Sequence, residues 1–315
     1  MKNLLFGMLA MAAMVSCSSE NDPIDDVTGG KQDKVEIKIA AGVLKAETKA
    51  PVDGWGEDGK YVQFVKGTAS GNYTDDWFAK ITGTAGTVQF KDASGELAND
   101  KSYYYESDGS DTYLRGFYPQ GTNTSGSVTF TIPEAADIDI MVSDEQSGNK
   151  TNAFGKFTFG HLLTQIKFSL KAGDGFPSNY VLKSITLKGT KKTATLALKT
   201  GQLTFTGADD DKIDIKVIEN GTSSISTAAT DMDRTVMVQP GVAMTLDIVA
   251  GVSGDNTQDR TYTGIPFTTK GGEGTEEEAK AGTAYTVTLT FSDKAVEATA
   301  GITPWATGTG EGTVQ

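Results

Sequence analysis

The chain has 315 residues, a formal net charge of −13, one cysteine and one histidine. A single cysteine excludes an intrachain disulfide, and this pair cannot supply the usual zinc ligands. An acidic chain is poorly suited to neutralise phosphates, so nucleic acid is not an expected partner, and solubility explains the charge. The 37 glycines and short apolar runs predict an all-β protein, and the length favours two domains.

Residues 1–16 have the organisation of a signal peptide, in which a lysine precedes an apolar run too short to span a bilayer as a stable helix. The residues before Cys17 resemble a bacterial lipobox, although Met14 stands where leucine is usual. The interpretation is cleavage between Ser16 and Cys17 and a lipid on Cys17, which would anchor the protein to a membrane. The alternative is an ordinary signal peptide with an incidental cysteine.

Residues 17–34 are polar and acidic and predict a disordered tether. Acidic residues soon after a lipidated cysteine also resemble the surface-export signal of Bacteroidota lipoproteins.

A first β-sandwich domain is expected over residues 35–155. Val35, Ile37 and Ile39 alternate with polar or small residues, which predicts a first strand at about 35–43. Further strands at short spacing favour a sandwich. They are Tyr61–Lys66, Asp76–Thr82, Thr87–Lys91, Ser102–Glu106, Tyr113–Tyr118, Ser127–Ile132 and Asp139–Ser143.

Several aromatic residues of this domain allow two interpretations. Trp55, Trp77 and the run Tyr103–Tyr105 could form a sugar-stacking platform or part of the core. Alternation along the strands favours the core.

The second sandwich is expected over residues 156–293 and opens with the most strand-like run of the chain, Lys156–Leu170. Phe157 and Phe159 lie on one parity and Ile166 to Leu170 on the other, which predicts a bulge or corner at Gly160. His161 is expected to be structural, because no partner motif for a catalytic base is nearby.

Seven more strands follow, and residues 294–315 form a tail that could add a short strand around Val296. The strands are Val181–Lys188, Thr193–Leu198, Gln202–Thr206, Lys212–Ile218, Thr235–Val238, Ala243–Ala250 and Ala284–Phe291. The acidic run Ala208–Asp211 lacks the ligand spacing of a calcium loop and predicts a solvated turn.

Four short motifs in chain order carry a resemblance to a known family. They are Gly116–Pro119, Asp139–Val142, Phe157–Ile166 and Ile302–Trp305. With the lipobox, they resemble the fimbrillin-like proteins, the type V pilins of Bacteroidota.

The resemblance implies two tandem transthyretin-like β-sandwich domains and export as a lipoprotein to the outer membrane. It also implies that a trypsin-like, often arginine-specific, protease removes the first strand. A neighbouring subunit then inserts a strand, and the tail 294–315 is a possible donor. Here the removable strand would be about 35–43, with Val35, Ile37 and Ile39 in its pockets.

The cleavage site implied by the resemblance is Lys49–Ala50, with Lys45–Ala46 second. The chain departs from the family here, because its arginines, Arg115, Arg234 and Arg260, all lie elsewhere. Either a lysine serves, or the subunit keeps its first strand as an anchor or tip.

The leading hypothesis is therefore a structural adhesion subunit of a surface filament. The alternative is a surface-exposed lipoprotein that binds a host or glycan ligand. No cofactor, metal site or catalytic residue is predicted. Two carboxylates that only folding brings together, as in a glycoside hydrolase, would leave no such pattern in the sequence.

Overall fold

The computed structural model describes residues 34–44, 54–208, 211–267, 269–270, 276–277 and 279–302. The predicted all-β class is confirmed, since the described residues form strands and no α-helix. None of them belongs to a helix that could cross a membrane. Ser16, Cys17, the four residues of the two predicted cleavage sites and the tail beyond residue 302 lie outside this part of the chain.

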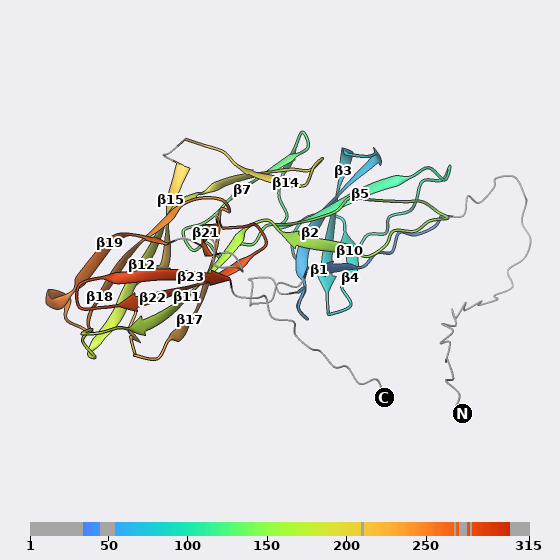
Figure 1. Ribbon diagram of the computed structural model, residues 1–315. Coiled ribbons are helices and arrows are strands. Elements are labelled where there is room, and N and C mark those ends of the chain that lie inside the picture. The colour runs from blue at the N-terminus through green and yellow to red at the C-terminus, as the bar shows by residue number, and fades with distance from the viewer. Residues whose placement is uncertain are drawn as a thin grey trace, which may run out of the picture. The chain divides into compact units, whose positions relative to one another are not determined.

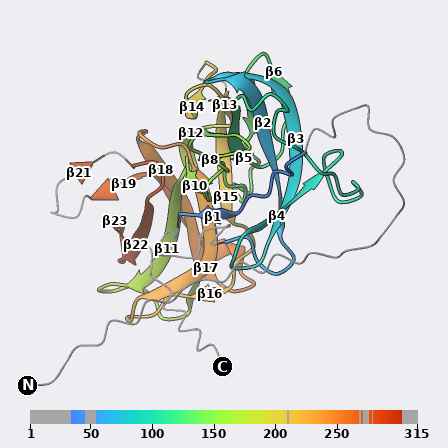
Figure 2. The same cartoon turned by 90° about the vertical axis from the view of Figure 1, so that its right-hand side faces the viewer.

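The first sheet has the strand order β1-β10-β8-β5-β2-β3-β4, and β9 pairs with β5 (Figures 1 and 2). Its strands are β1 (Ala41–Val43), β2 (Lys60–Ala69), β3 (Asn72–Thr82), β4 (Thr87–Lys91), β5 (Thr112–Tyr118), β8 (Met141–Ser143), β9 (Gln146–Gly148) and β10 (Phe157–His161). Along β2, Phe64 joins a smaller apolar core while Val65 on the other face joins a larger one. The sheet is thus covered on both faces, so its sequence does not alternate cleanly.

Two further sheets enclose the larger core. One has the order β17-β11-β22-β23, and the other has β15-β12-β18-β19 with β16 paired to β12. Their strands are β11 (Thr164–Ala172), β12 (Tyr180–Lys191), β15 (Lys212–Ile218), β16 (Ser223–Ser224), β17 (Thr230–Val238), β18 (Met244–Val252), β19 (Arg260–Phe267), β22 (Ala284–Phe291) and β23 (Val296–Ile302). A short ribbon of β20 (Thr269–Lys270) and β21 (Glu276–Glu277) completes the described strands of this region.

A fourth sheet joins segments from both sides of residue 156. Its order is β14-β13-β7-β6, formed by β6 (Asn123–Thr124), β7 (Ser127–Thr131), β13 (Thr193–Ala197) and β14 (Gln202–Phe205). Phe130 of β7 lies opposite Ala194 of β13, and both side chains belong to the larger core. The domain boundary at 155/156 stays a prediction. β10 follows this boundary but belongs to the first sheet, and β7 precedes it but pairs with β13.

The run Lys156–Leu170 forms two strands rather than one. β10 pairs with β1 and β8, whereas β11 pairs with β17 and β22. The predicted corner at Gly160 is wrong, because Gly160 lies within β10 opposite Val142. The chain changes sheets at residues 162–163, between β10 and β11. The two parities seen in the sequence therefore serve two cores, with Phe157 in the smaller and Ile166 in the larger.

His161 ends β10 as a buried side chain. Its Nδ1 lies 2.6 Å from Oδ2 of Asp139, whose side chain is also buried. The geometry agrees with the structural role expected for this histidine, because the pair holds the last residue of β10 to the segment before β8.

A carboxylate holds the β2–β3 turn in place. Glu145 accepts hydrogen bonds from Ser70 Oγ at 2.6 Å and from the Gly71 amide at 2.8 Å, and it also contacts the Tyr73 hydroxyl. Arg115 donates to the Tyr73 hydroxyl from Nε at 3.2 Å. Burial alone would raise the pKa of Glu145, but these hydrogen bonds and the Arg115 charge outweigh it and hold the pKa below its ordinary value of 4.5.

A lowered pKa makes this contribution to stability dependent on pH. The contribution is present above the unfolded pKa near 4.5 and is lost as the pH falls through the lower folded value. We expect Glu145→Gln to cost about 1 kcal/mol at pH 7 and to lose less stability than the parent on acidification below pH 4.5. Guanidinium melts across that range measure both effects, and parallel curves for the two proteins would contradict the assignment.

Gly116 of β5 has no room for a side chain. A Cβ there would lie 2.4 Å from Phe159 Cζ and 2.9 Å from Phe64 Cε1, both in fully buried rings. Gly116→Ala is expected to destabilise the fold by about 1–3 kcal/mol. Gly301→Ala is the matched control in a strand, because nothing lies within 4 Å of its added Cβ. Equal thermal midpoints for the two variants would be inconsistent with this packing.

Candidate functional site: the first segment and its groove

The N-terminal end of the described chain, Lys34–Leu44, lies as an extended segment against the first sheet, and we call it the first segment. The Ile37 amide donates to the Tyr103 carbonyl at 2.8 Å, and the Tyr105 amide donates to the Val35 carbonyl at 3.0 Å. Further along, the Ala41 amide donates to the Gly86 carbonyl at 2.9 Å. The segment thus pairs first with residues 103–105 and then with Gly86 before it pairs with β10.

Only the last part of the first segment is a regular strand. β1 lies beside β10 (Figure 2). The two strands are parallel, with Ala41 opposite Phe157 and Val43 opposite Phe159. The strand expected at 35–43 is therefore shorter than predicted. Residues before β1 form isolated bridges at Glu36 and Ala40, because their partners belong to different loops and strands.

Alternate side chains of the segment fill the smaller core. Ile37 is 2% exposed, Ile39 is 8% exposed and Ala41 is fully buried. Val35 was expected in the same pockets, but it is 39% exposed. This prediction is wrong because Val35 lies at the outer end of the segment, one residue beyond the bridge between Glu36 and Tyr104. Ala41 takes the third buried position, and its small side chain gave no apolar signal in the sequence.

Aromatic rings form the walls of the groove that holds the first segment. Trp55 meets Phe159 edge-on at 5.1 Å between ring centroids, and Phe64 meets Phe157 at 5.2 Å. Trp55 Nε1 also donates to the Ala41 carbonyl at 2.8 Å. The indole therefore fixes both the side of the groove and the register of the segment within it.

Most of the aromatic residues proposed for sugar stacking belong to the core. Trp55, Trp77 and Tyr105 are buried, and Tyr103 stacks on Trp77 at 3.9 Å. Tyr104 points outward and is 46% exposed. The core interpretation is confirmed for the three buried rings.

Gly86 permits the closest approach to the first segment. Its φ is +70°, and a Cβ built there would lie 1.6 Å from the Ala41 carbonyl oxygen. No other residue fits at this position without moving the segment.

The first segment borders open space on its outer side. A cavity of about 370 Å³ lies between residues 36–39 and β4, and another of about 390 Å³ lies beside Gly42, Trp55 and Lys156. Ile37, Ile39 and Ala41 are thus held in the core, while Glu36 and Lys38 are exposed on the outer side. The ends of the described chain at Leu44 and Gly54 flank residues 45–53, where both predicted cleavage sites lie outside the described residues.

The predicted donor region is partly described, and it forms β23. This strand occupies the end of its sheet and pairs antiparallel with β22, from Ile302 opposite Tyr285 to Val296 opposite Phe291. Val296 and Ala300 are buried in the larger core. The chain therefore holds this strand against its own sheet, where one backbone edge faces away from β22.

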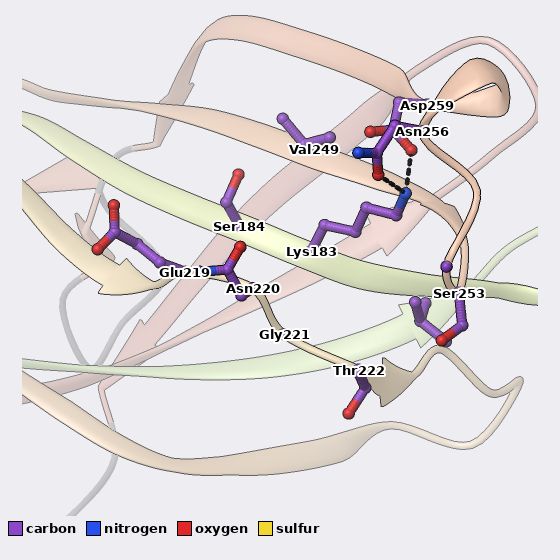
Figure 3. A pocket seen from close by; sticks show the side chains of 12 residues that line it. Lys183, Ser184, Glu219, Asn220, Gly221, Thr222, Val249, Ser253, Asn256 and Asp259 are labelled. Atoms are coloured by element: carbon purple, nitrogen blue, oxygen red, sulfur yellow. Dashed lines mark hydrogen bonds and ion pairs between the residues drawn. The ribbon is translucent and has the colours of Figure 1, made fainter.

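A polar pocket of about 490 Å³ is lined by residues of β12 and β18 and by the loop residues 219–222 and 253–259 (Figure 3). Lys183 points toward Asn256 and Asp259 and donates to Asn256 Oδ1 at 3.0 Å, to the Asp255 carbonyl at 2.9 Å and to Asp259. Its ammonium group is thus satisfied by protein oxygens, and no aromatic ring lines the pocket. Among the described residues, no group of three or more potential ligands could hold a metal ion.

A comparison with protein families matches residues 48–305 to a model described as fimbrillin-like. No curated protein matches the chain.

Crystal structures of candidate cell adhesion proteins from three Bacteroides species are similar in fold. The protein from Bacteroides uniformis has 20% identity and a TM-score of 0.58, covering 88% of this chain and 100% of its own. The protein from Bacteroides ovatus has 18% identity and a TM-score of 0.57, covering 86% and 98%. The protein from Bacteroides fragilis has 14% identity and a TM-score of 0.55, covering 88% and 100%.

The buried position of Ile37 gives a direct test of the groove. Ile37→Asp places a carboxylate among apolar side chains and is expected to cost at least about 3 kcal/mol. The matched control is Val35→Asp, the same kind of change at an exposed position, which should cost less than about 1 kcal/mol. Guanidinium melts of the uncleaved protein measure both. If Ile37→Asp melts like the parent, the first segment does not occupy the groove.

Proposed function

The chain belongs to the fimbrillin-like family, and we propose that it serves in a surface fimbria by exchanging its first segment for a strand of a neighbouring subunit. Membership of this family supports the general role of a structural pilus subunit at the cell surface that associates with other subunits. It is a structural family and not one of enzymes. The proposal concerns how this subunit assembles.

The way in which the first segment is held in its groove supports the proposed strand exchange. The first segment places Ile37, Ile39 and Ala41 in a groove and satisfies backbone groups along it, yet it contributes only three residues of regular strand. Such an arrangement is what strand addition uses, because main-chain hydrogen bonds give affinity and alternate side chains fill pockets. The matched family region begins at residue 48, beyond the first segment.

Removal of the first segment requires a cut between it and the groove. Residues 45–53 are the covalent connection, and they contain Lys49–Ala50 and Lys45–Ala46. We assign the cut to Lys49–Ala50 first and Lys45–Ala46 second, made by a trypsin-like protease that accepts lysine. Without this cut the subunit would keep its first segment and serve as an anchor or tip.

We also propose that a lipid attaches the precursor to the outer membrane and that the protein takes part in adhesion. Cleavage after Ser16 and a lipid on Cys17 would hold the precursor on the outer membrane. The three solved neighbours are described as candidate cell adhesion proteins, and we extend an adhesion role to this chain.

Glycan binding by the monomer is the weaker function. Trp55, Trp77 and Tyr105 are inside the protein, and the polar pocket around Lys183 offers no ring for a sugar to stack on. The groove, by contrast, holds an extended segment whose alternate side chains are buried. The geometry therefore favours the structural subunit.

The N-terminus of the protein recovered from the cell surface tests the processing step. We expect a start at Ala50 or Ala46, and we expect Lys45→Gln combined with Lys49→Gln to start at lipid-modified Cys17 and to be absent from filaments. End-sequencing and intact mass give the answer. A parent protein that starts at Cys17 would overturn removal of the first segment.

A further inference from the structure

The sheet β14-β13-β7-β6 has two faces of different chemistry. On the inner face, Phe130 of β7 and Ala194 and Leu196 of β13 are buried in the larger core. Because successive side chains of a strand point to opposite faces, the residues between them form the outer face. We call the eight outward residues of β7, β13 and β14 the threonine face. They are Ser127, Thr129, Thr131, Thr193, Thr195, Ala197, Gln202 and Thr204.

Threonines of neighbouring strands lie opposite one another across this face. Thr195 of β13 is opposite Thr129 of β7 on one side and Thr204 of β14 on the other. The hydroxyls of Thr129 and Thr195 lie 3.3 Å apart, and the Thr204 hydroxyl donates to the Thr195 carbonyl at 3.3 Å. Thr195 is therefore the centre of a regular surface that bears hydroxyl groups.

None of the eight residues is charged, although Lys, Arg, Asp and Glu make up 22% of the chain. The outer face of the sheet β15-β12-β18-β19 carries ion pairs instead. There Lys188 Nζ lies 2.7 Å from Asp247 Oδ2 and 3.7 Å from Asp214 Oδ2. The strand preference of threonine explains its presence in a sheet, but it does not explain why one outer face has ion pairs and another has no charge.

We propose that the threonine face is a lateral contact surface, which pairs with the same face of a second copy of this chain. The inference adds to the proposed function a contact between the sides of neighbouring filaments. It does not involve strand exchange, and the uncut monomer can be tested for it without any filament.

The chemistry of threonine suits a contact between identical faces. A hydroxyl group both donates and accepts hydrogen bonds, so one threonine face can satisfy the polar groups of another. The methyl groups of the same side chains can pack between the two sheets. In a two-fold symmetric contact both copies contribute the same patch, and a patch of hydroxyls is complementary to itself in a way that a patch of one charge is not.

The net charge of the chain also favours this face. Each copy carries a formal charge of −13, and a net charge far from zero keeps protein molecules apart. A contact through an uncharged patch adds no close pair of like charges and removes no ion from water. Lys192 and Lys199 flank β13 and are exposed, so the nearest charged residues along this strand lie beyond the ends of the face.

The small size of the face limits the strength of one contact. With about 4.8 Å between strands and about 3.4 Å per residue, three strands of about five residues present roughly 250 Å². A stable pair of proteins buries about 800 Å² on each partner, so a single pair of faces binds weakly. Subunits repeated along two filaments multiply the contact. The face can therefore hold filaments side by side while the precursor stays monomeric.

Cysteine trapping tests the contact in the uncut monomer. Whichever direction a two-fold axis takes in the plane of the contact, the central residue, Thr195, faces its own copy. The test variant carries Thr195→Cys in the full-length chain, with Cys17→Ser so that no other thiol is present. Under mild oxidation we expect its covalent dimer to form roughly tenfold faster than that of a control variant.

The matched control is Thr186→Cys with Cys17→Ser. Thr186 is half-buried like Thr195, but it lies among charged residues, opposite Asp247 of β18 and Lys216 of β15. Equal rates of dimer formation in the two variants would overturn the inference. Thermal melts under reducing conditions check that both variants keep the fold.

Charges placed on the face should prevent the contact. Thr129→Asp and Thr204→Asp change two exposed residues, and in a dimer they bring like charges together. Added to the Thr195→Cys variant, they should lower the rate of trapping to that of the control, whereas Thr129→Asn with Thr204→Asn should not. Added salt should partly restore trapping in the Asp variant, because it screens surface charges. Equal trapping in the Asp and Asn variants would contradict the assigned face.

Electron micrographs of assembled filaments give an independent measurement. Parent filaments should lie side by side, and filaments that carry Thr129→Asp and Thr204→Asp should be single and equally long. Parent filaments that are always single would overturn the lateral contact. A parent that forms no filaments would contradict the proposed function instead, and the trapping rates would then decide on this contact.

A neutral polysaccharide is the other partner that an uncharged hydroxyl face could bind, and insoluble cellulose is the probe for it. If the parent is retained on cellulose, the Asp variant is not, and the Thr195→Cys variant dimerises no faster than the control, then the face binds sugar and a second copy is not its partner.

Discussion

The smaller core depends on side chains of the first segment, which joins the first sheet as a regular strand only through the three residues of β1. Ile37, Ile39 and Ala41 pack with Phe64, Phe157 and Phe159 in one apolar cluster. Buried apolar surface is the main stabilising contribution in a small sandwich. A core completed by a nearly separate piece of chain will not persist as an open groove in water, so the piece must be present or be replaced.

Both cores meet at the first sheet, which connects the groove to the remainder of the protein. Phe64 faces the smaller core while Val65 and Phe117 face the larger one. β10 passes directly into β11, and β7 joins β13 across the same region. A pull on a strand seated beside β10 would therefore reach β11 and β22 through continuous main chain and paired strands. This is a suitable design for a subunit that bears load along a filament.

Sequence reasoning predicted the all-β class, most strands and the buried positions Ile37 and Ile39, because period-two alternation reports a strand with one buried face. It misplaced the corner near Gly160, since alternation shows that the buried face changes and not where the chain turns. It also placed Val35 in the core, because alternation cannot show which end of a segment lies outside the apolar cluster. The role of Trp55 was invisible, as it depends on a hydrogen bond to a carbonyl fourteen residues away.

The smallest buried side chain of the first segment, Ala41, lies where neighbouring residues approach the backbone most closely. A large apolar residue is tolerated in many pockets of similar size, but Ala41 is fully buried, and Gly86 and Trp55 both lie against its backbone carbonyl. Specificity between alternative strands is a difference of affinities, and a steric limit contributes by rejecting competitors. Within the uncut chain, this carbonyl therefore sets the position of the first segment in the groove, while the isoleucines bury the larger apolar side chains.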